Sequence, residues 1–89
     1  MSTTHELKVL PEYFLAVLER RKTFELRKDD RGYKVNDKLI LREWDGKHYS
    51  GRSIICRVTF ILKGFQGLDT DYAILSISLD DESNLTSTA

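Results

Sequence analysis

The run Arg52–Lys63 alternates between apolar and polar residues, and this pattern restricts the possible folds more than any other feature of the chain. Its apolar positions are Ile54, Cys56, Val58, Phe60 and Leu62, and its polar positions include Arg57, Thr59 and Lys63. Successive side chains of a strand point to opposite faces. The run therefore predicts a long strand with one core face and one wet face.

The same reasoning predicts the other elements. Pro11 suits the first turn of a helix, and Phe14, Val17 and Leu18 follow at helical spacing. After Lys22 the period changes to two, which indicates a strand. The predicted elements are strands at 5–10, 22–27, 38–45, 52–63 and 72–79, a helix at 11–20, a loop at 29–37 and a hairpin turn at 46–51.

Five strands and one helix within 89 residues predict a mainly β fold, a small pseudobarrel that closes its sheet edges. A ferredoxin-like sandwich is not expected, because a second helix is missing. We expect a single domain at residues 1–79. Residues 80–89 are acidic and polar, without aromatic residues, and are expected to form a disordered tail.

Charge is distributed unevenly although the formal net charge is zero. Residues 1–63 contain all 14 basic residues against 9 acidic ones, and residues 64–89 contain 5 acidic residues. The folded part is therefore mildly basic, which is compatible with a phosphate-containing partner. No stretch has the ~20 apolar residues of a membrane helix, and no signal peptide is recognisable, so we expect a cytoplasmic protein.

Cysteine and histidine offer little chemistry. Cys56 is the only cysteine, and its apolar flanks predict a core residue. His5 and His48 have no metal ligand at suitable spacing, so both are expected to be surface or capping residues. We accordingly expect no metal, no cofactor and a monomer.

One strand face carries the residues that we single out. Thr23, Glu25 and Arg27 lie ~6.6–7 Å apart in order along it, and Lys22 precedes them. A carboxylate can accept hydrogen bonds from the amino group of a base, and a guanidinium can bind a phosphate or stack on a base. The alternative is a solvated strand face with a Glu25–Arg27 ion pair, which would contribute little.

The neighbouring sequence favours the first interpretation. The segment 20–34 has the densest positive charge of the chain, with Lys28 and Arg31 among its cations. Tyr33 and Trp44 could supply stacking planes for bases, with Arg42 on the same strand face as Trp44. For Trp44 the alternative is a plug at the mouth of the barrel.

Several motifs together resemble the ASCH superfamily of PUA-like domains, specifically its short bacterial and phage branch described only as a domain of unknown function. They are H-E-L-K at 5–8, L-P-E-Y-F at 10–14, K-T-F-E-L-R at 22–27, N-D at 36–37 and L-R-E-W-D at 41–45. The resemblance implies a PUA-like pseudobarrel, with a helix at one opening and a cleft that carries Lys22, Thr23, Glu25 and Arg27. It also implies RNA binding or RNA processing.

Two positions depart from the family pattern, which usually has glycine after the helix and before Asp37. Here Arg20 and Asn36 occupy them. Asn36 can adopt the same left-handed backbone, whereas Arg20 would bear strain of ~1 kcal/mol unless the helix ends differently.

Some ASCH proteins that resemble this chain hydrolyse the acetyl group of N4-acetylcytidine, with a lysine, a threonine nucleophile and a distal glutamate. Lys22 matches the lysine, but Glu25 stands in place of the threonine, and Thr23 lies ~6.6–7 Å away along the strand. The first hypothesis is therefore a module that binds RNA or a modified nucleotide. Alternatives are a small amidohydrolase acting on N4-acylated cytidine or a weak ribonuclease using Lys22, Thr23 and Glu25, and a protein–protein adaptor.

Overall fold

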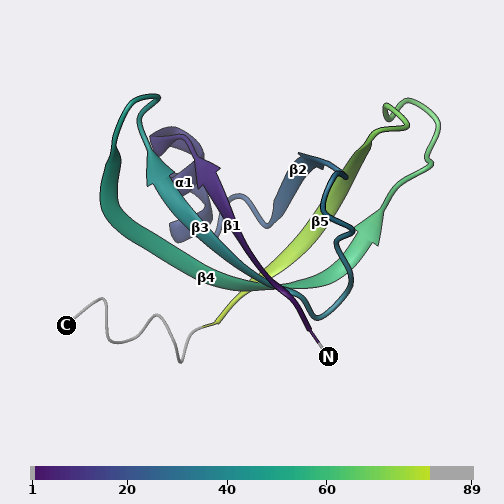
Figure 1. The fold of residues 1–89 in the computed structure, drawn as a ribbon, viewed down its shortest axis with the longest axis horizontal. Coiled ribbons are helices and arrows are strands. Elements are labelled where there is room, and N and C mark those ends of the chain that lie inside the picture. The colour runs from purple at the N-terminus through teal and green to yellow at the C-terminus, as the bar shows by residue number, and fades with distance from the viewer. Residues whose placement is uncertain (1, 81–89) are drawn as a thin grey trace.

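All strands of the part of the chain that the structure describes belong to one curled sheet (Figure 1). The computed structural model describes residues 2–80. The elements are β1 (Thr4–Val9), α1 (Pro11–Leu18), β2 (Phe24–Lys28), β3 (Lys38–Trp44), β4 (Tyr49–Leu62) and β5 (Tyr72–Leu79). The strand order is β1-β3-β4-β5-β2, and only the β1–β3 pair is parallel. This arrangement confirms the predicted mainly β pseudobarrel with one helix.

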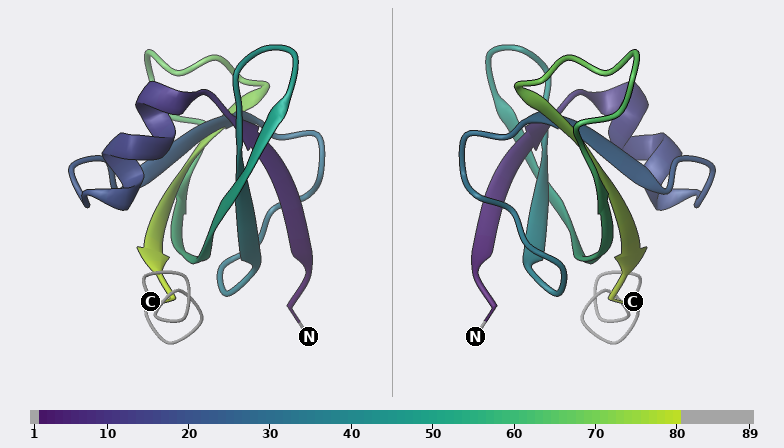
Figure 2. Two further views of the ribbon diagram at one scale, coloured as in Figure 1. Left: turned by 90° about the vertical axis from the view of Figure 1, so that its left-hand side faces the viewer. Right: turned by 90° about the vertical axis from the view of Figure 1, so that its right-hand side faces the viewer.

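Helix α1 lies at one end of the curled sheet, and β1 begins and β5 ends at the other (Figure 2). The helix buries Phe14 and Val17, as the helical spacing predicts, but Leu18 is exposed. Leu18 belongs to the last turn and lies outside the buried stripe. Within residues 2–80, no helix is long and apolar enough to cross a membrane.

The helix ends two residues earlier than predicted, in a Schellman motif. The Arg20 N–H donates to the Val17 carbonyl oxygen and the Arg21 N–H to that of Ala16, both at 2.9 Å. Arg20 has φ 64°, the left-handed conformation that glycine adopts without strain. Arg20 therefore has the left-handed backbone for which strain was expected. Asn36 also has a positive φ, of 79°.

The core lies inside the curl. It is formed by apolar residues of α1, of the strands β1, β3, β4 and β5, and of the loop before β3: Leu7, Val9, Phe14, Val17, Tyr33, Leu39, Leu41, Ile54, Cys56, Val58, Ala73, Leu75 and Ile77. Cys56 is fully buried, as predicted. Phe60 is 59% exposed, and Leu62 is half-buried opposite the outward Ile74, so the prediction of both as core-face residues is wrong. The pairing of β4 with β5 shifts register between Val58 and Phe60. Because this bulge adds one residue to β4, Phe60 points to the outer face instead of the core.

Two arginine side chains bridge the sheet edges that backbone pairing leaves open. The Arg27 Nη2 donates to the carbonyl oxygen of Lys8 at 2.6 Å, and the Arg31 Nη1 donates to that of Glu6 at 2.8 Å. Both carbonyls belong to β1, whose ladder partner is β3 on the other side. Side chains, rather than a backbone ladder, therefore join β1 to the β2 segment.

His5 is buried, which contradicts its prediction as a surface or capping residue. Its Nε2 lies 2.9 Å from the Asp37 carboxylate, which also accepts hydrogen bonds from the Thr3 and Lys34 N–H groups. The ring of Tyr33 packs edge-on against the imidazole, with 4.7 Å between the centroids. The start of β1 is thereby fixed to the turn before β3. Asp80 still bonds to Ile55, and the rest of the predicted tail lies outside the described residues.

Candidate functional site

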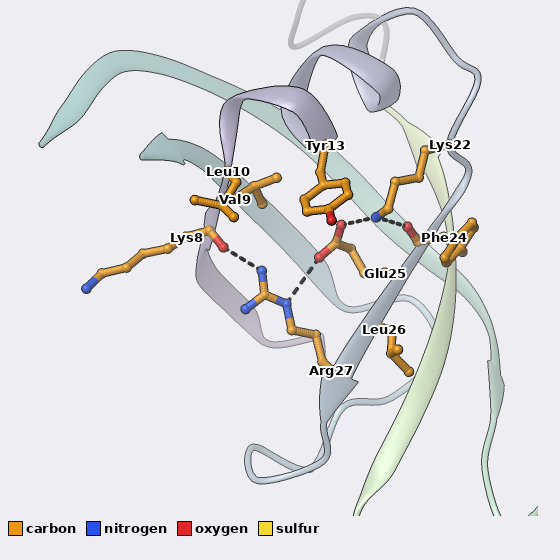
Figure 3. Close-up of a pocket in the computed structure, with 9 residues that line it drawn as sticks. All are labelled: Lys8, Val9, Leu10, Tyr13, Lys22, Phe24, Glu25, Leu26 and Arg27. Carbon is orange, nitrogen blue, oxygen red and sulfur yellow. Dashed lines mark hydrogen bonds and ion pairs between the residues drawn. The ribbon is translucent and has the colours of Figure 1, made fainter. Parts of the chain in front are cut away.

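A pocket of about 440 Å³ opens between the end of β1, the start of α1 and β2 (Figure 3). It is lined by Lys8, Val9, Leu10, Tyr13, Lys22, Phe24, Glu25, Leu26 and Arg27. Its volume falls within the ~300–1,000 Å³ of small-molecule sites. The pocket therefore lies where the polar row of the sequence was expected to form a cleft.

Glu25 is the buried polar centre of this pocket. Its side chain is 5% exposed, and each carboxylate oxygen accepts from a different cation. The Lys22 Nζ lies 2.6 Å from Oε1, and the Arg27 Nε lies 3.1 Å from Oε2. The interpretation of this row as a solvated face is wrong, although its Glu25–Arg27 ion pair exists. Two cations around one carboxylate leave the site with an excess of positive charge.

Local backbone structure explains how these groups meet. The Schellman turn brings the chain back toward α1, where the Lys22 N–H donates to the carbonyl oxygen of Ala16 at 3.0 Å. Strand β2 then pairs with β5, with Glu25 opposite Leu75, whose side chain is buried. Because the alternation places Glu25 inside, Phe24 and Leu26 face outward, with 44% and 50% of their surfaces exposed.

Aromatic rings flank the lysine. The Lys22 Nζ lies 4.7 Å from the centroid of Phe24 and 6.0 Å from that of Tyr13, and it also donates to the Phe24 carbonyl oxygen at 2.6 Å. Figure 3 shows the hydroxyl of Tyr13 directed toward Glu25. The pocket thus combines charged hydrogen-bond donors with apolar and aromatic walls, a combination suited to a planar polar ligand.

The structure brings together Lys22, Glu25 and Arg27 but separates the other predicted site residues. Thr23 is exposed and does not line the pocket. Lys28 is exposed on β2, and Arg31 is held at the Glu6 carbonyl. None of these three side chains contributes to the pocket wall.

The predicted stacking residues lie elsewhere as well. Tyr33 is only 5% exposed, so it has no ring face for a base. Arg42 and Trp44 alternate with the inward residues Leu41 and Glu43 and therefore lie on the outer face of β3. There the Lys8 Nζ lies 4.7 Å from the Trp44 centroid, which connects this face to the rim of the pocket.

Sequence reasoning missed the contribution of β1 and α1, namely Lys8, Val9, Leu10 and Tyr13. Tyr13 carried a usable signal, because it is an aromatic residue outside the buried stripe of the helix. The β1 residues carried none, since their position depends on how the curled sheet brings its two edges together.

Other polar groups inside the fold have structural roles. Glu43 accepts two hydrogen bonds from Arg52, at 2.9 and 3.0 Å, and this pairing lowers the pKa of its carboxyl. Burial raises the pKa of the Cys56 thiol to about 12, and the Glu25 carboxylate adds to the effect. Among residues 2–80, no group of three or more metal-ligating side chains is found.

Comparison with known proteins agrees with the expected relationship to an uncharacterised family that includes phage proteins. A family model described as "Domain of unknown function (DUF3850)" matches residues 4–77. The chain is also 40% identical over 75 residues to an "Uncharacterized 12.9 kDa protein in GpA 3'region" of Escherichia phage P2, covering 84% of this chain and 68% of the phage protein. The chain therefore belongs to the DUF3850 family.

Proposed function

We propose that the pocket binds a nucleotide, either free and modified or as part of an RNA chain. The observation that carries this proposal is the buried Glu25 carboxylate between Lys22 and Arg27, at a pocket with aromatic walls. Each carboxylate oxygen has a second lone pair, so Glu25 can still accept a hydrogen bond from the amino group of a base. The two cations can donate to an adjacent carbonyl or phosphate oxygen.

The sequence resemblance to the ASCH superfamily supports the same ligand class, because those domains are regarded as RNA-binding by kinship with PUA domains. Binding is favoured over amide hydrolysis through a side-chain nucleophile. None of the residues that line the pocket carries a serine or threonine hydroxyl or a thiol, and Thr23 is exposed outside it. A pocket without such a nucleophile suits recognition better than acyl transfer.

The test compares Lys22→Ala with Lys38→Ala, a matched control at a half-buried lysine of β3 that does not line the pocket. Fluorescence anisotropy would measure binding of labelled single-stranded and hairpin RNA, and circular dichroism would verify folding. Removing a charged hydrogen bond costs ~1.5–3 kcal/mol, so we expect Lys22→Ala to weaken binding roughly 10- to 150-fold. Lys38→Ala should retain the wild-type affinity.

Salt provides a second readout, because phosphate contacts release counterions and make the affinity fall with ionic strength. If the wild-type protein binds neither RNA with any dependence on salt, or if the two lysine variants bind equally well, the proposal is wrong. Incubation with N4-acetylcytidine separates binding from catalysis. Turnover by the wild-type protein above that of Lys22→Ala would establish the hydrolase instead.

A further inference from the structure

The outer face of β2, β5 and the C-terminal end of β4 is unusually apolar for a surface. We call it the β2–β5–β4 face and define it by Phe24, Leu26, Phe60, Leu62, Tyr72 and Ile74. Phe24, Leu26, Phe60 and Tyr72 are 44%, 50%, 59% and 38% exposed, and the other two are half-buried. These strands form one arm of the curl in Figure 1. A contiguous apolar patch of this kind marks an interaction site.

The strand register arranges two of its aromatic rings around a small residue. Phe24 and Phe60 both pair with Ser76 of β5, from opposite sides. The backbones of Phe24 and Phe60 are two strand spacings apart, or ~9.6 Å. A third ring placed above Ser76 would therefore lie ~4.8 Å from each phenylalanine. Aromatic pairs interact at centroid separations of ~4.5–7 Å. The positions thus suit a flat ring between the two phenylalanines.

The next row continues the surface. Leu26 and Leu62 both pair with Ile74, so an aliphatic surface lies beside the space between Phe24 and Phe60. Tyr72 follows on β5, opposite Lys28. The face thus extends along β5 for more than one ring, far enough for a short chain of bases.

The charge of the face identifies the partner. Its outward positions on β2, β5 and residues 57–62 of β4 include the cations Lys28 and Arg57 and no carboxylate. Arg57 is half-buried and donates to the Asn36 carbonyl oxygen at 2.8 Å, which holds its guanidinium in place. Exposed rings beside cations match the π-faces and phosphates of single-stranded nucleic acid.

The face is continuous with the pocket through Phe24. This residue lines the pocket and also belongs to the β2–β5–β4 face. Figure 3 shows its ring pointing away from Glu25, with the Lys22 Nζ beside it. A single-stranded nucleic acid with one nucleotide in the pocket would pass over Phe24 onto the outer face of the sheet.

We propose that the β2–β5–β4 face is a second binding surface for single-stranded nucleic acid, on which bases stack against Phe24 and Phe60 beside Lys28 and Arg57. The inference extends the proposed function and rests on it only for the class of ligand. Paired bases would not present their faces to these rings, so the surface selects unpaired strands.

The test compares Phe60→Ala with Phe65→Ala. The two side chains are 59% and 61% exposed, but Phe65 lies in the loop between β4 and β5, outside the face. The probes are a labelled eight-nucleotide cytidine RNA and cytidine monophosphate, whose base carries the amino group that Glu25 would bind. Because stacking on one aromatic residue is worth ~1–3 kcal/mol, Phe60→Ala should weaken octamer binding roughly 5- to 150-fold, while monophosphate binding and the Phe65→Ala variant remain as in the wild type.

The outcomes separate the two proposals. Loss of octamer binding in Phe60→Ala but not in Lys22→Ala would retain the outer face and reject the pocket. Equal octamer affinity for Phe60→Ala and Phe65→Ala, or no octamer binding by the wild-type protein at low salt, would overturn the inference. A wild-type dimer in analytical ultracentrifugation that Phe60→Ala dissociates would also overturn it, because the face would then bind a second copy.

Discussion

Replacing Asp37 by alanine should destabilise the fold strongly, because its carboxylate accepts three hydrogen bonds. The donors are the Thr3 N–H, the Lys34 N–H and the His5 Nε2, at 3.0, 3.0 and 2.9 Å. In Asp37→Ala all three lose their partner. Thr3 and Lys34 are exposed, so water replaces part of their loss, but His5 is buried and its imidazole is not compensated.

An unsatisfied donor costs ~1–3 kcal/mol, with the lower value for groups that water can reach, so the three together amount to roughly 3–5 kcal/mol. The total stability of a domain is ~5–15 kcal/mol, so the substitution removes a large fraction of it. At ~4–8 °C per kcal/mol for a domain of this size, the melting temperature should fall by roughly 12–40 °C. Asp37→Asn keeps one acceptor oxygen and should lose less.

Urea unfolding would measure these effects, with Asp30→Ala as the matched control. Asp30 lies in the same loop and is exposed, and its backbone N–H, not its carboxylate, bonds to the Lys28 carbonyl oxygen. We expect the control to change stability by less than ~0.5 kcal/mol. The reasoning is refuted if Asp37→Ala unfolds within about 1 kcal/mol of the wild type at an unchanged m value, or no earlier than Asp30→Ala.

Two further predictions concern titrating groups. Burial raises the pKa of Asp37, but hydrogen bonds from Thr3, His5 and Lys34 outweigh it and leave the pKa below its ordinary value of 3.8. The stability that the Asp37 carboxylate contributes is therefore complete above about pH 4 and is lost as the pH falls through the lower pKa of the folded state. The free energy of unfolding should accordingly fall less steeply with acid in Asp37→Asn than in the wild type. The Cys56 thiol, with a pKa of about 12, should not react with a thiol reagent at pH 8 until the protein unfolds, and rapid stoichiometric labelling of the native protein would contradict its burial.

The fold was predictable because periodicity reports which face of a strand is buried. The alternation at Ala73, Leu75 and Ile77 gave β5 its correct bounds and its correct inner face. It failed at Phe60, where a bulge adds a residue to one strand only. Nothing in the local pattern of β4 records the register of its partner strand.

Only those site residues that lie close together in the sequence could be predicted. Lys22, Glu25 and Arg27 lie close in sequence, so strand geometry was sufficient to group them. The burial of Glu25 was not foreseen, because alternation does not say which face of β2 is inside when both faces carry plausible residues. The roles of His5 and Tyr33 required the contact between β1 and the 33–37 segment, which is set by tertiary structure.

The two arginine contacts to β1 also protect the protein from its own strand edges. An edge strand with exposed carbonyl groups can pair with another chain and so start aggregation. Arg27 and Arg31 occupy the carbonyl oxygens of Lys8 and Glu6, and both place a bulky cation where a foreign strand would have to dock. Arg27 thus covers a strand edge in addition to lining the pocket. Its replacement would expose this edge to pairing with another chain and would also alter the pocket.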